Sequence, residues 1–320
     1  MNAPKASTER KVVVLGTGGT IAGTADSATD SIGYRAASLG VQALLDAVPA
    51  LAGRPIECEQ VAQVDSKDMT LALWLSLTKV LRRHLDRPEV CGVVITHGTD
   101  TLEETAYFLH RVLAPAKPVV LTAAMRPATS LQADGPQNLL DAVTLAHGGA
   151  MNGVLAVLGG QVWAGAELRK LHGWRIDAFG AGDGGPLALL QDGVLQRFRE
   201  QPPAAAHAAV GRMPADEKGW PVVELITSHA HARESTLDAL VAGGAQGIVI
   251  AGTGNGSVHS ALERAARRAI AAGVPVVRAS RCLLGGVVGA PLDALPSYGS
   301  LTPFQARIEL MLDLVAGRWP

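Results

Sequence analysis

The sequence predicts an α/β fold of two α/β domains: a larger N-terminal domain with a mostly parallel sheet and a smaller C-terminal one. Short apolar runs rich in β-branched residues alternate with amphipathic segments of helix length. The runs are continuously apolar, which is typical of strands buried on both faces of a parallel sheet. Hydrophobic residues make up 48% of the 320 and charged residues 18%, enough apolar material for a packed core.

The individual elements follow from this alternation. Strands are expected at Lys11–Leu15, Gly92–Thr96, Pro118–Thr122, Gly153–Leu158, Val222–Ile226, Gly247–Ile250 and Pro275–Arg278. Helices are expected at Leu39–Ala47, Thr70–Leu85, Leu102–Leu113, Pro136–His147, Ser235–Val241 and Ser257–Ala272. A last helix around Glu309 would dock through Leu310, Met311 and Leu314.

The alternation breaks once, between about Gly193 and Trp220, in a stretch of Pro, Ala and charged residues. Such a stretch predicts a linker or a long ordered connection. We therefore expect an N-terminal catalytic domain over 9–195, a linker over 196–220 and a C-terminal domain over 221–320.

Composition excludes several classes of protein. The 28 basic and 29 acidic side chains leave a net charge of −1, so no basic surface for nucleic acid is expected. The longest apolar stretches have the length of strands, which argues against a membrane protein. Residues 1–11 are polar, and the sequence therefore predicts no signal peptide. Three scattered cysteines, Cys58, Cys91 and Cys282, fit reduced thiols in the cytoplasm.

Glycines and hydroxyl residues follow several of the predicted strands. These segments are Gly16–Gly23, His97–Thr101, Ala123–Arg126 and Ala251–Ser257. In parallel sheets the ligand lies beyond the carboxyl ends of the strands. The sequence therefore predicts a binding site lined by small polar residues on one rim.

The first of these turns does not fit a nucleotide-binding motif. A G-x-G-x-x-G pattern from Gly16 needs glycine where Ile21 stands, and one from Gly18 fails at its second glycine, where Thr20 stands. No phosphate-loop pattern occurs in the chain. What remains is a tight turn with backbone N–H groups that suit a carboxylate or an oxyanion, or simply a strand–helix turn that needs small residues.

The second turn places Thr99 and Asp100 between a strand and a helix. Either residue could serve only as a helix N-cap. Glu103 and Glu104 follow in the first helical turn, where carboxylates favour the helix dipole. His229 and His231 form only a two-ligand fragment, so no metal site is predicted.

Several segments together resemble the bacterial-type L-asparaginases. The segment Thr17–Gly23 (TGGTIAG) is similar to the first signature of the family, and Ile95–Leu109 (ITHGTDTLEETAYFL) is similar to the second. Further matches are Ala124–Ser130 with Ala133–Pro136, the turn Val64–Met69, Gly254–Gly256 and Arg278–Arg281. The resemblance runs from about Lys11 to Ala316, nearly the whole chain.

The resemblance implies hydrolysis of the side-chain amide of L-asparagine to L-aspartate and ammonia, without a cofactor. It implies a homotetramer, a dimer of dimers, whose sites form between the N-terminal domain of one subunit and the C-terminal domain of a neighbour. Thr20 is the implied nucleophile with Tyr34 as partner, and Thr99, Asp100 and Lys170 form a second catalytic group. Substrate-binding residues would be Gly19, Ser66, Lys67, Ala124 and, from the neighbouring subunit, Asn255. Ser66 would hold the α-carboxylate and Asp100 the α-amino group.

These residue types suit the chemistry. A threonine hydroxyl is a poor nucleophile until a base takes its proton. A lysine can be that base only if its pKa falls from about 10.4 towards neutrality, and the charge of Asp100 beside Lys170 opposes this. Two roles for Lys170 therefore stay open: electrostatic stabilisation, or proton transfer through Thr99. The N–H groups around Gly19, Thr20 and Thr99 are candidates for the oxyanion.

Alternatives exist for two of these residues. The small, polar segment Thr24–Ser38 fits a lid that closes over substrate, and Tyr34 could merely cover the pocket from it. Lys170 could be a solvated surface lysine, with Arg169 as its immediate competitor for the role.

The sequence departs from the family pattern at two places. Leu292 stands where the family has a carboxylate that supports the tyrosine, although Asp293 is adjacent. Lys67 stands where relatives often carry glutamine, which bears on the preference between asparagine and glutamine. The paired cysteines of secreted relatives are also absent.

Three other functions compete with this interpretation. One is a glutaminase-leaning amidohydrolase. Another is an inactive relative that only binds asparagine or aspartate, which Leu292 keeps open. A third is a self-cleaving amidase with an N-terminal threonine, for which Gly-Thr steps exist but the surrounding signature does not match.

Overall fold

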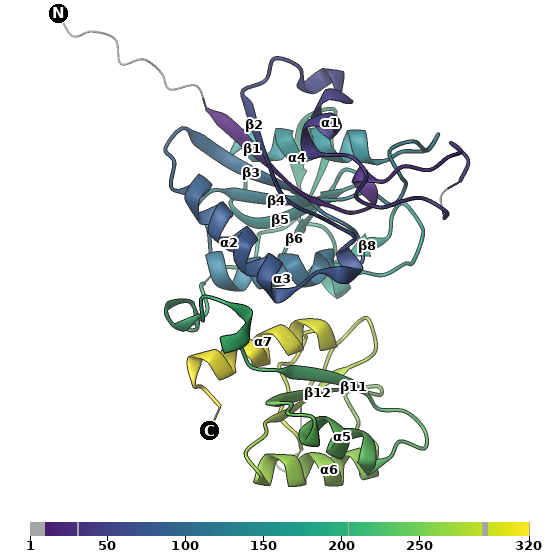
Figure 1. Ribbon diagram of the computed structural model, residues 1–320, viewed down its shortest axis with the longest axis vertical. Helices are drawn as coiled ribbons and strands as arrows, with labels where there is room; N and C mark the ends of the chain where they lie inside the picture. Colours follow the sequence, from purple (N-terminus) through teal and green to yellow (C-terminus); the bar gives the residue numbers. More distant parts are fainter. Residues whose placement is uncertain (1–9, 31, 204, 290–293, 320) are drawn as a thin grey trace, which may run out of the picture. The chain divides into compact units, whose positions relative to one another are not determined.

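Strands between Lys11 and Arg197 pair side by side in one eight-stranded sheet, whose central strands are buried apolar runs (Figure 1). The computed structural model describes residues 10–30, 32–203, 205–289 and 294–319 and divides into two units, Met1–Ala206 and His207–Pro320. The sheet belongs to the first unit, and its strand order is β10-β9-β6-β5-β4-β3-β1-β2. Its strands are β1 (Lys11–Gly18), β2 (Ile56–Val64), β3 (Val90–Thr96), β4 (Pro118–Thr122), β5 (Gly153–Leu158), β6 (Gln161–Ala164), β9 (Ala188–Gln191) and β10 (Val194–Arg197).

Strands β1 to β5 pair in parallel, and β6, β9 and β10 continue the sheet in antiparallel fashion. The helices of this unit are α1 (Val41–Asp46), α2 (Leu71–Leu85), α3 (Leu102–Leu113) and α4 (Gly135–Gly148). Alternate residues of β1 point to opposite faces, and Val12 and Val14 share a buried cluster with α1 and α4. Helices α2 and α3 cover the other face, where Trp74 stacks on Phe108 at a centroid distance of 4.8 Å.

The second unit repeats the same principle on a smaller scale. Strands β11 (Val223–Thr227), β12 (Gly247–Gly252) and β13 (Val276–Ser280) form a parallel sheet in the order β11-β12-β13. Helices α5 (Glu234–Ala242) and α6 (Ser260–Ala271) pack on one side, and α7 (Pro303–Ala316) lies against the strands. Leu310 and Leu314 of α7 approach Gly247, so this helix docks as its apolar side predicted. Both units confirm the predicted fold class.

Some elements were not among the expected ones. Strand β2 alternates polar and apolar residues and is largely half-buried, because it lies at the edge of the sheet. Strands β7 (Arg169–Lys170) and β8 (Phe179–Gly180) form a separate two-stranded sheet too short to leave a periodic signal.

Short 3₁₀ turns complete the chain: η1 (Thr20–Ala22), η2 (Pro49–Leu51), η3 (Ser66–Asp68), η4 (Gly182–Gly184), η5 (Val210–Arg212) and η6 (Glu217–Gly219). The last two lie in the stretch expected to be a linker, and its bounds stay a prediction. Within the described ranges no helix has the length and apolarity needed to cross a membrane.

Candidate active site

The strand order of the large sheet reverses beside β1. The chain goes from β1 to β2 on one side and then crosses to β3 on the other, so β1 and β3 are neighbours at a topological switch point. Gly16 of β1 stands opposite Thr96 of β3, and the Thr17 hydroxyl donates to the Thr96 carbonyl at 2.8 Å. Ligands bind outside the carboxyl ends of strands at such a point. The two turns singled out in the sequence therefore lie side by side.

Three backbone segments meet here without room for side chains. A Cβ atom on Gly19 would stand 2.2 Å from the Cα atom of Gly98, and one on Gly98 would stand 2.4 Å from the Ser66 hydroxyl. Gly19 also has φ +82°, a conformation that L side chains rarely adopt. Glycine at both positions is thus a condition for bringing the turns after β1, β2 and β3 together.

Thr20 begins η1 directly after this contact, and its side chain is buried. Its hydroxyl lies 2.7 Å from the phenolic oxygen of Tyr34, and either group can be the donor. Tyr34 comes from the segment 24–38, which is mostly exposed along its described residues. Thr24 and Arg35 close this segment by two backbone hydrogen bonds of 3.0 and 2.8 Å. The predicted partner of Thr20 is therefore in contact with it.

Thr99, Asp100 and Lys170 form a second cluster beside the first. The Lys170 ammonium donates to the Thr99 hydroxyl at 3.0 Å and to the Asp100 carboxylate at 2.5 Å. The Lys170 side chain is only 16% exposed, whereas that of Asp100 is 53% exposed. Lys170 is thus not a solvated surface lysine, and Asp100 presents a carboxylate to solvent beside it.

Ser66 opens η3 at the end of β2 and is 1% exposed. Its hydroxyl accepts a hydrogen bond from the Asp100 N–H at 3.1 Å, and its carbonyl accepts one from the Thr101 hydroxyl at 2.8 Å. Because the hydroxyl acts as acceptor towards Asp100, its own hydrogen can be donated to a ligand such as a carboxylate.

Lys67 follows Ser66 and is far more exposed. Its ammonium lies 2.7 Å from Asp65 and 4.0 Å from Asp68. The hydrogen bond with Asp65 raises the pKa of Lys67, so this side chain is a permanent cation at the rim of the site.

Two predicted contacts take a different form in the structure. The Gly19 N–H donates to the Val64 carbonyl at 2.9 Å, so the expectation that it is a free donor for an oxyanion is wrong. The N–H groups of Thr20 and Thr99 form no hydrogen bond with another described residue, which leaves them available. The Ala124 side chain is buried in the core, so this residue can offer a ligand only its backbone.

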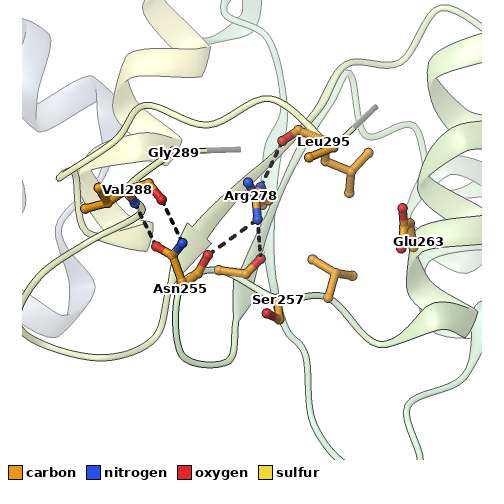
Figure 2. Close-up of a pocket in the computed structure, with 10 residues that line it drawn as sticks. Asn255, Ser257, Glu263, Arg278, Val288, Gly289 and Leu295 are labelled. Carbon is orange, nitrogen blue, oxygen red and sulfur yellow. Dashed lines mark hydrogen bonds between the residues drawn. The ribbon is translucent and has the colours of Figure 1, made fainter. Parts of the chain in front are cut away.

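Asn255 belongs to the second unit, where it follows β12 (Figure 2). Its amide nitrogen donates to the Val288 carbonyl at 2.8 Å, and its amide oxygen accepts the Val288 N–H at 2.7 Å. The guanidinium of the buried Arg278 donates to the carbonyls of Asn255, Gly256 and Leu295. These residues border a cavity of about 480 Å³.

The Asn255 side chain is thus paired within its own unit, and its reach into a neighbouring subunit stays a prediction. Leu292 and Asp293, the two positions that bear on the family carboxylate, lie outside the described residues.

His97 supports the second turn from beneath. Its Nδ1–H donates to the Gly98 carbonyl at 2.7 Å, and its Nε2 accepts from the Thr105 hydroxyl at 3.0 Å, as assigned from the network. Thr105 in turn accepts the Trp74 indole N–H at 2.8 Å. Burial lowers the pKa of His97 to about 4, so the ring is neutral at pH 7.

Glu103 is a residue near the site whose position the sequence did not reveal. Its carboxylate accepts the backbone N–H of Lys170 at 2.9 Å and is 9% exposed. Burial raises its pKa to about 7, against the effect of the Lys170 N–H. The helix dipole alone, which the sequence suggested, does not explain a buried carboxylate. Among the described residues no group of three or more His, Cys, Asp or Glu side chains is placed to hold a metal ion.

Comparison with known proteins decides the family. The family described as "Asparaginase, N-terminal" matches residues 11–203, and the "Glutaminase/Asparaginase C-terminal domain" matches residues 222–319. The chain belongs to the asparaginase family.

Individual relatives agree with this assignment. The chain is 37% identical to L-asparaginase 2 of Escherichia coli over 318 residues, which covers 97% of this chain and 90% of the relative. It is also 37% identical to a glutaminase-asparaginase of Pseudomonas fluorescens, over 87% of this chain and 77% of the relative. The crystal structure of a probable cytoplasmic L-asparaginase from Campylobacter jejuni superposes with a TM-score of 0.87 at 35% identity. It covers 96% of this chain, and the match spans 95% of that structure's chain.

Proposed function

We propose that this protein is an L-asparaginase, which hydrolyses the side-chain amide of L-asparagine to L-aspartate and ammonia through a threonine nucleophile. The observation that carries the proposal is the pair of threonine hydroxyls at the switch point. Each is buried, and each has a proton-carrying partner in contact: Tyr34 for Thr20 and Lys170 for Thr99. The matching relatives, named L-asparaginase or glutaminase-asparaginase, support the choice of substrate.

In the first half of the reaction, the Thr20 oxygen attacks the amide carbon of the substrate. The threonine proton passes by way of the Tyr34 oxygen to the amide nitrogen, the C–N bond breaks, and ammonia leaves an ester of Thr20. In the second half, water adds to the ester carbon, the bond to the Thr20 oxygen breaks, and a proton of that water restores the Thr20 hydroxyl as aspartate is released. The N–H groups of Thr20 and Thr99 stabilise the oxyanion in each half.

Thr99 and Lys170 assist this chemistry from the neighbouring turn. With its ammonium charged, Lys170 stabilises negative charge developing near the Thr99 hydroxyl; with the amine neutral, it accepts a proton through that hydroxyl. Ser66 donates to the α-carboxylate of the substrate, with the Lys67 cation nearby, and the open carboxylate of Asp100 binds the α-ammonium group. No cofactor is needed for these steps.

The rest of the proposal follows the family resemblance. We propose a cytoplasmic homotetramer in which Asn255 of a neighbouring subunit completes each site. The three described cysteines are unpaired, and the Campylobacter relative is itself named cytoplasmic. The reaction would serve the catabolism of asparagine.

Glutamine is a second candidate substrate, favoured by one observation. Lys67 places an exposed cation beside the position expected for the α-carboxylate, where it can attract a longer substrate as well. The test compares kcat/KM for the two amides. A higher value for glutamine than for asparagine would make glutamine the main substrate.

The test is ammonia release from L-asparagine by the wild-type chain and by two variants, Thr20→Ala and Thr99→Val. Each variant should lower kcat about 10³-fold or more, because each removes a hydroxyl from the reacting centre. Thr20→Ser, which keeps the hydroxyl, should retain measurable turnover. Tight binding of aspartate without turnover by the wild type would indicate a binding protein instead, and kcat within twofold of the wild type in either variant would refute the assigned roles.

A further inference from the structure

Lys170 reaches the site from outside the large sheet. It lies on β7, a strand of two residues that pairs with the equally short β8 in a separate two-stranded sheet. The other residues of the two clusters follow strands of the large sheet or, like Tyr34, stand on the neighbouring segment 24–38. The ammonium, which lies 3.0 Å from the Thr99 hydroxyl, therefore depends for its place on an element that does not belong to that sheet.

The Glu103 side chain joins the main chain of this element to the helix that follows the Thr99 turn. Glu103 is the second residue of α3, the helix that begins just after Thr99 and Asp100. Its carboxylate accepts the Lys170 N–H at 2.9 Å, across 67 residues of sequence. Asp100 and Glu103 thus hold the same lysine at its two ends: one the ammonium, the other the main chain.

We propose that Glu103 is a positioning residue that sets the place of Lys170 relative to Thr99, an inference that rests on the proposed function. It touches neither substrate nor reacting atoms and acts through the main chain of Lys170. Burying a carboxylate to 9% exposure costs free energy unless the group is hydrogen-bonded, and the contact with the Lys170 N–H supplies such a bond. Misplacement of a catalytic group by about 1 Å can lower a rate substantially.

The charges around Glu103 agree with such a role. Glu104 on its own helix repels the carboxylate, whereas Arg169 and Lys170 on β7 attract it. Burial is the larger influence and raises the pKa of Glu103, and the cations on β7 offset part of this in favour of the ionised carboxylate, which is the better acceptor for a backbone N–H.

The test compares Glu103→Met and Glu103→Gln. Methionine keeps the bulk and removes the strong acceptor, whereas glutamine keeps an oxygen that can accept the Lys170 N–H. We expect E103M to lower kcat at least tenfold with KM within about threefold, and E103Q to stay within about threefold of the wild type. Glu103→Ala also removes the acceptor but shortens the side chain, and it should lower kcat as well if the acceptor is what matters.

Asp141→Ala is the matched control. Asp141 is a buried carboxylate on α4 that accepts a hydrogen bond from Gln137 and contacts none of the proposed site residues. Its loss should lower the melting temperature and leave kcat within twofold. Hydrogen exchange measured by mass spectrometry should show faster exchange over residues 168–172 in E103M and E103A, but not in E103Q or D141A.

Three outcomes would overturn the inference: kcat in folded E103M or E103A within twofold of the wild type, equal losses in E103M and E103Q, or an equal loss in D141A. Failure of the proposed function looks different, because then the wild type itself would release no ammonia from asparagine.

Discussion

Thr20 and Thr99 have similar burial but very different surroundings. Thr99 contacts a lysine that is itself fixed by Asp100 and Glu103, and the turn rests on the buried His97, Thr105 and Trp74. Thr20 contacts a tyrosine on a mostly exposed segment, where Asp30 accepts the N–H groups of Ile32 and Gly33. One hydroxyl is thus held by the core of the fold, and the other depends on a surface segment.

The difference teaches which part of the site is built before substrate arrives. Buried hydrogen-bond networks hold their members in one arrangement, since an unsatisfied buried group is costly. An exposed segment with local turns has less to lose by moving. We therefore expect the Thr99 cluster to keep its geometry and the Thr20–Tyr34 pair to be adjusted on binding.

The largest expected effect on kcat distinguishes Lys170, the partner of Thr99, from Tyr34, the partner of Thr20. Lys170→Met should lower kcat about 10³-fold, because it removes a buried charge that Thr99 and Asp100 both use. Tyr34→Phe should lower kcat about 10²-fold. The loss is smaller because the segment that carries Tyr34 is exposed, and a solvent water can take over part of the role of the phenol hydroxyl. Steady-state kinetics with asparagine measure both, and Lys170→Arg is the control that keeps the charge. A loss in Y34F greater than in K170M would reverse the comparison.

Two glycines test the same contrast through stability. Gly19→Ala places a Cβ atom 2.2 Å from the Gly98 backbone at φ +82°, and should destabilise the fold by about 3 kcal/mol or more. Gly33→Ala meets only the end of the half-buried Asp30 side chain, at 2.5 Å, which can turn away. We expect G33A to change the melting temperature by no more than a degree or two, about the effect of an ordinary surface substitution. Equal destabilisation by the two changes would contradict the distinction between core turn and surface segment.

The buried groups behind Thr99 predict a pH dependence of stability. Burial raises the pKa of Glu103 from 4.5 to about 7, so the folded state binds this proton more tightly than the unfolded state. Its contribution to the free energy of unfolding therefore falls as the pH rises from 4.5 through 7, by about 3 kcal/mol in all. Glu103→Gln removes this loss, so the stability of E103Q relative to the wild type should increase between pH 5 and pH 8.

His97 acts in the opposite direction. Its pKa is lowered from 6.5 to about 4, so its contribution is complete above pH 6.5 and is lost as the pH falls through 4. Between pH 4.5 and 6.5 the two groups nearly cancel in the wild type. Thermal melts of E103Q should then reveal the slope of His97, with stability rising with pH. A constant difference between E103Q and the wild type would refute the Glu103 assignment, and a stability of E103Q that does not rise with pH would refute that of His97.

The smallest expected effect lies at the exposed rim. Lys67→Gln removes a cation that is paired with Asp65 and open to solvent, so screening limits its influence on a substrate carboxylate. We expect kcat/KM for asparagine to change about threefold and the ratio of asparagine to glutamine hydrolysis to shift by a similar factor. Asp68→Asn at the same rim is a control that removes a charge of opposite sign. A change of a hundredfold would place Lys67 among the central binding groups.

Much of the large sheet was predictable, because its central strands are buried on both faces and read as continuous apolar runs. Strand β2 was not predicted, because it is an edge strand with one solvated side. Its polar residues Glu57, Glu59 and Gln60 interrupt the apolar pattern. The predicted motifs at the strand ends do meet, as parallel strands bring their carboxyl ends to one rim.

The contacts that fix the site could not be predicted in the same way. Glu103 looks like a helix-dipole carboxylate in the sequence, and only the path of the chain over 67 residues brings it to Lys170. Likewise, no local pattern shows that Asn255 pairs with Val288 or that the Gly19 N–H is already used by Val64. Such contacts depend on the register between segments, which the order of residues along one segment does not contain.

The two-stranded sheet of β7 and β8 has a consequence for engineering. Thr20, Ser66 and Thr99 stand on turns locked together by glycine contacts, so a change in one of these turns disturbs the others. Lys170 lies on a separate two-stranded sheet, whose main chain is hydrogen-bonded to Glu103 of the helix α3. Substitutions in this sheet are therefore expected to act on the proton-handling group more than on the turns that carry the nucleophile and the substrate pocket.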